Sequence, residues 1–188
     1  MWSTPSSIAQ RLIAASLALC CGGALHAQPA AALRAINSLD VPRYMGTWYE
    51  IAKYPNQFQK QCIANTLAEY RLLSTGDLQV INRCKTSDGQ DLVAIGEARQ
   101  LGSATSPKLQ VRFAPSWLSM FPFVWGNYWV IDLDSSYQLA AVSEPERDYL
   151  WILSRSPKVS AEVFNALLLR LKSQGFDLNR LERSNHVP

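Results

Sequence analysis

Few residues of this chain offer acid–base or metal chemistry. It has only two histidines in 188 residues, and His26 falls in an N-terminal stretch that reads as a removable leader. The other, His186, is expected in a frayed tail. A Ser-His-Asp triad needs a histidine beside its nucleophile, and a multi-histidine metal site needs several. The sequence therefore excludes both, and we assign no catalytic and no metal-binding residue.

Glu50 is the one residue for which carboxylate chemistry remains open. It shares the strand parity of Trp48 and is expected to face the interior. No acid–base partner for it is evident. The alternative is a structural ion pair at the closed end of the fold, and we expect a raised pKa only if that partner is missing. An enzyme is therefore the weaker hypothesis.

Tyr70 and Tyr128 would have to ligate iron if the chain carried haem, because no interior histidine is expected. Tyrosine is an uncommon ligand for that purpose. We expect no cofactor, and a pigment without metal remains an alternative ligand.

The N-terminal residues 1–27 read as an export signal. Arg11 precedes the apolar run "LIAASLALCCGGAL", and "HAQ" places the cleavage after Ala27. The sequence "LALC" also resembles a lipidation signal that would modify Cys20 or Cys21, although Leu19 is bulky for that position. We therefore expect an exported protein of the cell envelope: on the outer membrane facing the periplasm if lipidated, and otherwise soluble in the periplasm.

Cys62 and Cys84 are the cysteines that remain after the leader. An even pair in an exported chain suggests a disulfide, and two free buried thiols are the alternative. A simple hairpin about "STGD" would place Cys84 opposite residue 67. A bridge to Cys62 would then require the segment before residue 66 to fold back, since cysteine Cα atoms must approach within about 7 Å.

The elements expected to position these residues are β-strands, which makes the fold all-β. Eight short runs separated by turn residues read as strands, at 46–54, 65–73, 77–84, 91–100, 107–113, 127–133, 137–143 and 149–155. In "AEYRL" and "LQVRF" apolar and polar residues alternate, which indicates one buried face. Eight antiparallel strands can close into a barrel with room for side chains or one small ligand.

One helix follows the strands. Ser160 is a plausible N-cap, Gly175 ends the segment, and Val163, Leu167 and Leu171 recur every four residues, flanked by Phe164 and Leu168. We expect this stripe to pack on the outside of the barrel. The alternative is that it binds a membrane or a partner helix. The domains predicted are a leader (1–27), a loose N-terminal arm (28–42) and one barrel domain (43–183).

Small residues are expected on the inner face of the barrel. Ala68, Ala94, Gly96, Ala98 and Ala140 share the inward parity. Small inward side chains leave space, which predicts a cavity. The alternative is that large neighbours such as Tyr70, Phe113 and Trp151 fill it.

Three segments carry a family resemblance. "MGTWYEIAKYP", "NYWVIDLDSSYQLAAVSEP" and "DYLWILSRSP" occur in the order and places of the three signatures of the lipocalins, over about residues 39–183. The chain resembles the bacterial outer-membrane lipoproteins of that family. The resemblance implies that Trp48 plugs the closed end, that Arg155 lies across its ring, and that Gly46 permits close backbone approach.

The resemblance also implies ligand binding by the cavity wall. Strand parity assigns inward positions to a set of wall residues, with Tyr128 expected near the mouth: Ala68, Tyr70, Val80, Asn82, Leu109, Val111, Phe113, Tyr128, Val130, Ala140 and Trp151. The implied ligand is a fatty acid or a lysophospholipid, carried for envelope maintenance. A net charge of +3 without a basic cluster makes nucleic acid an unlikely partner.

The segment 114–129, "APSWLSMFPFVWGNYW", is uncharged and rich in aromatic residues. It joins two strands at the expected open end, where the loops 55–64 and 84–91 also lie. Such a loop could cover the cavity, touch a membrane, form a homodimer contact, or fold onto its own barrel. We expect lipid to pass between membrane and barrel along a set of apolar side chains: Trp117, Leu118, Phe121, Phe123 and Trp125.

Overall fold

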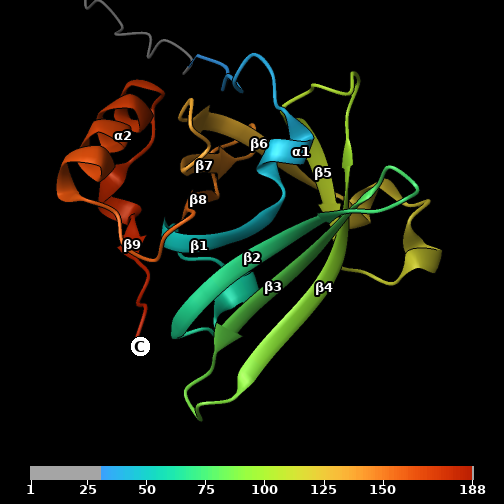
Figure 1. The fold of residues 1–188 in the computed structure, drawn as a ribbon, viewed down its shortest axis with the longest axis horizontal. Helices are drawn as coiled ribbons and strands as arrows, with labels where there is room; N and C mark the ends of the chain where they lie inside the picture. The colour runs from blue at the N-terminus through green and yellow to red at the C-terminus, as the bar shows by residue number, and fades with distance from the viewer. Residues whose placement is uncertain (1–30, 188) are drawn as a thin grey trace, which may run out of the picture.

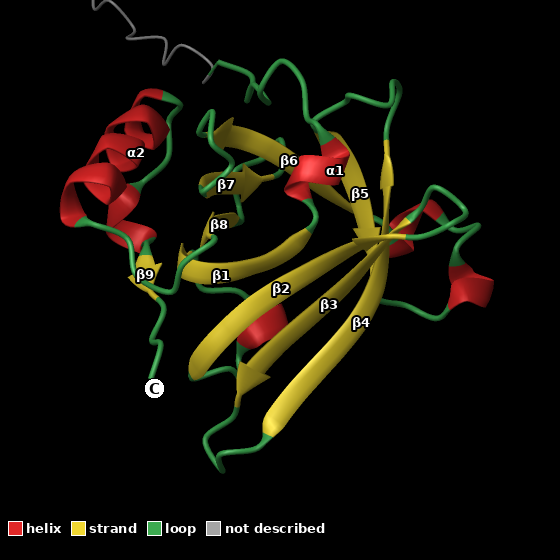
Figure 2. Ribbon diagram, viewed as in Figure 1, coloured by secondary structure: helices red, strands yellow, loops and turns green. Residues whose placement is uncertain are grey.

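Eight antiparallel strands close into a barrel, as the turn spacing predicts (Figures 1 and 2). The computed structural model describes residues 31–187, so the leader with Cys20 and Cys21 lies outside the described residues. The barrel strands are β1 (Gly46–Lys53), β2 (Ala64–Leu72), β3 (Leu78–Lys85), β4 (Asp91–Gln100), β5 (Lys108–Arg112), β6 (Gly126–Leu133), β7 (Leu139–Ser143) and β8 (Leu150–Ser154). Each strand pairs with its chain neighbour, and β1 closes the ring by pairing with both β8 and β2.

The two ends of the barrel differ. The connections 54–63, 86–90, 113–125 and 144–149 gather at what we call the open end, and 73–77, 101–107 and 134–138 gather at the closed end. Strands β2, β3 and β4 are long and extend beyond the others toward the β3–β4 turn (Figure 1). The wall is therefore taller on this side than on the side of β5–β8.

A short helix and a tryptophan seal the closed end. The helix α1 (Val41–Tyr44) lies beside Trp48, whose fully buried ring donates from Nε1 to the Tyr44 carbonyl at 2.8 Å. The Arg155 guanidinium lies 4.0 Å from the Trp48 ring centroid and donates to the carbonyls of Thr47 and Arg43, each at 2.9 Å. Gly46 has φ +95°, and a Cβ there would lie 3.3 Å from Arg155 Nη1, so this entry to β1 requires glycine.

Residues 31–42 are not the loose arm that the sequence suggested. Leu39 is 1% exposed within the closed-end core, and Leu33 packs in the layer beneath the C-terminal helix. Backbone hydrogen bonds join Ile36 N–H to the Val130 carbonyl at 2.9 Å and Leu39 N–H to the Thr105 carbonyl at 2.8 Å. The isolated leucines among alanines gave no periodic pattern, yet each occupies a buried site that fixes the segment.

The helix α2 (Ala161–Ser173) packs outside the barrel, as expected (Figure 1). The Ser160 side chain accepts from Val163 N–H, and Gly175, with φ +89°, follows the last turn. Phe164, Leu167 and Leu171 form the buried face, whereas Val163, placed on the stripe by its spacing, is 49% exposed. No helix within residues 31–187 is long and apolar enough to cross a bilayer.

A two-residue strand extends the wall where β1 and β2 separate. Strand β1 pairs with β2 only over Gly46–Tyr49, and β9 (Glu182–Arg183) then pairs with Ala52 and Lys53. His186 follows β9 with Nε2 2.7 Å from the Glu50 carbonyl oxygen. The expectation of a frayed tail at His186 was therefore wrong, because backbone pairing with β1 holds these residues.

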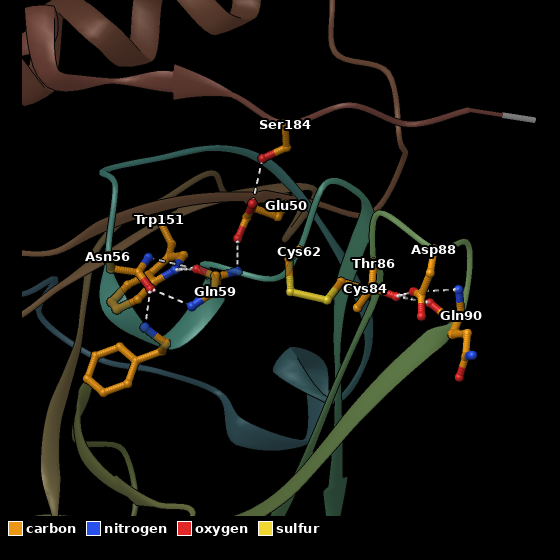
Figure 3. Close-up of a disulfide and its surroundings, with 11 residues drawn as sticks. Glu50, Asn56, Gln59, Cys62, Cys84, Thr86, Asp88, Gln90, Trp151 and Ser184 are labelled. Carbon is orange, nitrogen blue, oxygen red and sulfur yellow. Dashed lines mark hydrogen bonds between the residues drawn. A yellow bond between two sulfur atoms is a disulfide. The ribbon is translucent and has the colours of Figure 1, made fainter.

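Cys62 and Cys84 form a disulfide, with their Cα atoms 5.5 Å apart (Figure 3). Strand β2 does not fold back to reach it. Leu67 pairs with Arg83, the register shifts at Asn65, which has φ +54°, and Ala64 pairs with Lys85. This irregularity keeps β2 beside β3 up to the bridge, so Cys62 reaches Cys84 without the chain folding back.

Candidate ligand-binding site

The inner wall becomes more accessible from the closed end to the open end. Six of the predicted wall residues are buried: Ala68, Tyr70, Val80, Leu109, Val130 and Ala140. Five keep accessible surface, and all five lie toward the open end: Asn82, Val111, Phe113, Tyr128 and Trp151. The barrel is thus a cup with a filled floor and an accessible upper half, and these five residues outline the candidate site.

The small inward residues do not leave the lower half hollow. Ala98 and Ala140 are 2% and 0% exposed, and Gly96 is also buried, because large rings of the closed-end core lie against this part of the wall. At Gly96 a Cβ would meet the Phe113 ring at 2.7 Å, so that ring already takes the space. The prediction of a cavity was therefore wrong for the floor, and of the five alanine and glycine positions only Ala94 is exposed.

Three tyrosine hydroxyls meet at the floor of the cup. The Tyr128 hydroxyl lies 2.9 Å from that of Tyr44 and 2.9 Å from that of Tyr70. Burial raises the pKa of Tyr44 and of Tyr128 well above the usual phenol value, and that of Tyr70 to about 12. All three are therefore neutral near pH 7. The backbone of Tyr128 lies toward the open end, as expected, but its hydroxyl reaches down to the closed-end core.

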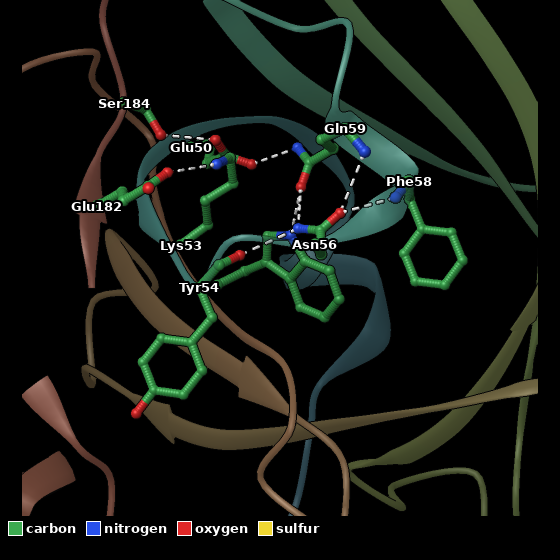
Figure 4. Close-up of polar contacts among 9 residues, drawn as sticks. Glu50, Lys53, Tyr54, Asn56, Phe58, Gln59, Glu182 and Ser184 are labelled. Atoms are coloured by element: carbon green, nitrogen blue, oxygen red, sulfur yellow. Dashed lines mark hydrogen bonds and ion pairs between the residues drawn. The ribbon is translucent and has the colours of Figure 1, made fainter. Parts of the chain in front are cut away.

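A polar frame stands at one side of the open end (Figure 4). Asn56 caps the short helix η1 (Gln57–Gln59) by accepting from the N–H groups of Phe58 and Gln59, each at 3.1 Å. The Gln59 Oε1 accepts from Trp151 Nε1 at 2.9 Å and from Asn56 Nδ2 at 2.8 Å. Gln59 Nε2 donates to Glu50 Oε2 at 2.5 Å. The indole of Trp151 is thereby fixed at the cup wall by a loop residue.

Glu50 is buried in the gap between β1 and β2. It is 3% exposed, and besides Gln59 it accepts from Ser184 Oγ at 2.6 Å. It makes no ion pair with another residue of the described segment, and Lys53 instead pairs with Glu182 at 3.3 Å. Burial raises its pKa, the direction expected for a carboxyl group without such a partner. Two neutral donors hold it in the wall, which fits a structural role better than general-base catalysis.

Aromatic rings form a row from the open end into the cup. Phe58, 65% exposed, lies 5.5 Å from Tyr149 between ring centroids, and Tyr149 stacks on Trp151 at 5.7 Å with an interplanar angle of 15°. The outer ring, that of Phe58, is exposed to solvent, and the inner ring, that of Trp151, is part of the wall. This row offers a continuous apolar surface along which an elongated molecule could enter.

The aromatic loop, residues 113–125 between β5 and β6, does not close over the cup. It contains two short helices, η2 (Ser116–Leu118) and η3 (Pro122–Val124), on the side of the barrel opposite α2 (Figure 2). Trp117, Phe121 and Phe123 are 71%, 41% and 80% exposed, and Leu118 is partly buried. Side chains this exposed are not packed against the barrel.

Trp125 has a different role from the rest of the loop. Its ring lies over the guanidinium groups of Arg99 at 4.1 Å and Arg112 at 5.2 Å, and its Nε1 donates to the Ser119 carbonyl at 2.8 Å. Since Arg112 also pairs with Glu97 on the outer face of β4–β5, Trp125 anchors the loop to the outside of the wall. The prediction that it is a free mouth residue was wrong.

Exposed apolar side chains gather at the open end. Strand β4 pairs with β5 only from Glu97 onward, which leaves residues 91–96 without a partner on that side. Ten large apolar residues, which we call the apolar rim, are exposed on this edge and the adjoining connections: Phe58, Ile63, Leu92, Val93, Ile95, Phe113, Trp117, Met120, Phe121 and Phe123. Exposed apolar side chains gathered at one end of a protein often mark an interaction surface.

Two hollows lie outside the barrel wall. One of about 540 Å³ is bordered by residues 33–37, 103 and 106–108, and one of about 150 Å³ lies between Glu50, Ile63 and the segment 182–185. Neither opens onto the accessible wall residues. No group of three or more His, Cys, Asp or Glu side chains within residues 31–187 is placed to hold a metal ion. The cup therefore remains the candidate site.

Sequence reasoning missed Tyr44, Gln59 and Tyr149, which belong to the cup or its edge. All three lie in connections or in the short α1 helix, where strand parity gives no direction. A usable signal was Asn56 three residues before Gln59, since asparagine caps short helices and fixes the residues of the first turn.

Comparisons with known proteins agree with this architecture. The family model of the lipocalin-like domain matches residues 39–186. The chain is 39% identical to outer membrane lipoprotein Blc of Escherichia coli over 153 residues, 81% of this chain and 82% of that one. It is 33% identical to temperature-induced lipocalin-1 of Arabidopsis thaliana, with the same two shares, and 33% identical to mouse apolipoprotein D over 80% of this chain and 78% of that one. Among solved structures, insecticyanin from the tobacco hornworm superposes with a TM-score of 0.63 at 20% identity, covering 81% of this chain and 84% of that one, which supports the fold alone.

Proposed function

The chain belongs to the lipocalin family, and from that premise we propose that it binds a single-chain fatty acid or lysophospholipid in the upper half of its barrel and carries it within the cell envelope. The observation that carries this proposal is the gradient along the inner wall. Apolar and aromatic side chains with a few polar groups become accessible toward one end only. A concave apolar site with a few fixed polar groups is typical of sites for small amphiphiles.

The cup suits one acyl chain better than a bulky lipid. Its floor is closed by Trp48 and the three tyrosines, so only the space beside Val111, Asn82 and Trp151 is available. An elongated ligand would lie along the row of Phe58, Tyr149 and Trp151 and leave its outer end at the open rim.

The apolar rim supports delivery from a membrane surface. Aromatic side chains favour the bilayer interface, and Trp117 and Phe123 are the most exposed rings of the rim. With the rim against a bilayer, a lipid could pass into the cup without crossing water. A homodimer contact through the same surface is the competing use.

The proposed location is the cell envelope. Blc is named an outer membrane lipoprotein, and the leader expected at residues 1–27 would export this chain in the same direction. Attachment through Cys20 or Cys21 and release after Ala27 predict different mature masses.

Native mass spectrometry of the full chain purified from its envelope fraction tests the proposal. We expect a protein–lipid complex whose added mass corresponds to one fatty acid or lysophospholipid. The same spectrum reports N-terminal processing and oligomeric state. Protein that carries no lipid, and that binds neither added fatty acid nor added lysophospholipid, would refute the proposed function.

A vesicle experiment tests the rim separately. Trp117→Ser with Phe123→Ser should weaken binding to vesicles of phosphatidylethanolamine and phosphatidylglycerol by about tenfold or more, because two apolar rings are lost from the contact. Affinity for monomeric fatty acid should stay nearly unchanged. Val163→Ser with Leu169→Ser, both exposed on α2, is the matched control and should leave vesicle binding intact.

A pigment carrier is the second candidate. The parallel stacking of Tyr149 on Trp151 would suit a planar ring system. An absorbance band above the aromatic region in freshly purified protein would favour it over the lipid carrier.

A further inference from the structure

The tyrosine cluster at the cup floor has one more donor than it can use internally. Tyr44, Tyr70 and Tyr128 contribute three O–H groups, and only two hydroxyl–hydroxyl contacts join them. Each contact consumes one proton. One phenol proton therefore has no acceptor within the cluster, and no other acceptor contacts these hydroxyls within residues 31–187.

A buried donor left unpaired is unfavourable, so an external acceptor such as water or a ligand oxygen stabilises the cluster. One arrangement leaves the spare proton where a ligand can reach it. Tyr44 and Tyr70 both donate to Tyr128, whose oxygen has two lone pairs, and Tyr128 then directs its own proton elsewhere. Tyr44 and Tyr70 are 2% and 5% exposed, whereas Tyr128 is only partly buried. The free donor then belongs to the one tyrosine of the three that keeps accessible surface.

We propose that Tyr128 donates a hydrogen bond to an oxygen at the inner end of the bound ligand, so that the cup selects single-chain lipids that enter with their oxygen-bearing end first. This proposal rests on the proposed function. The fitting class is a free fatty acid or a long-chain alcohol. A lysophospholipid cannot take this orientation, because its head group is too large to reach the filled floor. In the opposite orientation its methyl end would face the hydroxyls, which it cannot pair with.

The charge beneath the floor agrees with an oxygen acceptor. Arg155 lies under the Trp48 ring, and Tyr44 packs against that ring with centroids 4.8 Å apart. A fixed positive charge on the far side of the floor favours electronegative atoms above it. Burial keeps the three phenols protonated, so they remain donors and do not repel a carboxylate.

Binding of three chain-matched probes by the full-length protein tests this proposal: dodecanoic acid, 1-dodecanol and 1-chlorododecane. The chlorinated probe has the same apolar chain but a poor acceptor. Tyr128→Phe should weaken binding of dodecanol about 3–10-fold and of dodecanoic acid about tenfold or more, and it should leave chlorododecane within twofold. Intrinsic tryptophan fluorescence and calorimetry both measure these affinities.

Further variants separate donation to the ligand from packing. Tyr44→Phe and Tyr70→Phe each leave Tyr128 able to donate, so their selective losses should be smaller than that of Tyr128→Phe. Tyr54→Phe is the matched control, since Tyr54 donates to the Asp177 carbonyl at 2.9 Å on the outer side of the barrel. It should lower stability without changing any of the three affinities.

The outcomes are distinguishable. If wild-type protein binds none of the probes, the proposed function itself fails. If all three bind and Tyr128→Phe weakens them equally, or weakens none, the oxygen-first orientation is wrong while the carrier function stands. Tighter binding of a lysophospholipid to Tyr128→Phe than to wild type, with no selective loss of dodecanol, would also overturn the inference.

Discussion

Loss of the Cys62–Cys84 disulfide should cost the barrel a substantial part of its stability. The bridge closes a loop with a sequence separation of 22. In the chain-entropy treatment a loop of this length raises the free energy of the unfolded chain by about 3.4 kcal/mol at 25 °C. For a domain of this size each 1 kcal/mol moves the melting temperature by about 2–4 °C, so the midpoint should fall by roughly 7–14 °C.

The assay compares oxidised and reduced wild type with the double variant Cys62→Ala, Cys84→Ala by thermal and urea unfolding. Reduction removes the cross-link but no heavy atoms, whereas the variant also removes buried sulfur at Cys84. Reduced wild type should therefore show the cross-link effect alone, and the variant should be equal to it or slightly less stable. The variant must not respond to reductant, which is the internal control.

A local measurement distinguishes the mechanism. Ile63 N–H donates to the Lys85 carbonyl at 2.8 Å beside the bridge, so its hydrogen exchange reports whether the start of β2 stays paired. If reduction lowers the midpoint by less than about 2 °C, the β2–β3 hairpin already holds these cysteines together in the unfolded chain. The entropic reasoning would then be refuted for this bridge.

Three further predictions concern the closed end, the buried carboxyl group and the wall. Arg155→Met should destabilise the fold by about 2–4 kcal/mol in urea titrations, because hydrogen bonds to backbone carbonyls and the contact with Trp48 are lost together; a loss below 1 kcal/mol would contradict this role. Burial raises the pKa of Glu50 from its ordinary value of 4.5, so its contribution to stability is complete below the unfolded pKa and is lost as pH rises through the higher folded pKa. Melting temperatures measured from acidic to neutral pH should therefore fall less in Glu50→Gln than in wild type, and parallel curves would disprove the assignment. Gly96→Ala should cost about 1–3 kcal/mol and displace Phe113, seen as altered exchange at the mouth, because the new Cβ would meet the Arg112 carbonyl oxygen at 2.5 Å; an unchanged midpoint would show that the wall is looser than described.

The framework of the barrel could be predicted because its signals are local. Alternation in β2 and β5 gave the inner face, and turn residues separated the strands. The capping serine at 160 and the glycine at 175 gave the limits of α2. These features depend on near neighbours in the chain, which a sequence exposes directly.

The filling of the cup could not be predicted in the same way. Parity identifies which side chains point inward but not how far each ring reaches, and Tyr44 arrives from outside the strands to pack against Tyr70 and Tyr128. The same limit explains Tyr128, whose backbone lies toward the open end while its hydroxyl points to the floor. Ring reach and contacts from α1 are properties of the assembled barrel.

The pairing of β1 with β8 and β9 has a consequence for how the chain acquires its shape. Residues 46–49 pair with β2 close by in the chain, but residues 49–53 find their other partners only at 151–154 and 182–183, so the ring cannot close until residue 183 has been made. Until then β1 offers an unsatisfied backbone edge, and the carboxyl group of Glu50 lacks the hydrogen bond that the Ser184 hydroxyl donates in the folded protein. Synthesis from one end to the other should thus leave an incomplete sheet that is vulnerable to wrong partners, and a chaperone that shields β1 would act in that interval.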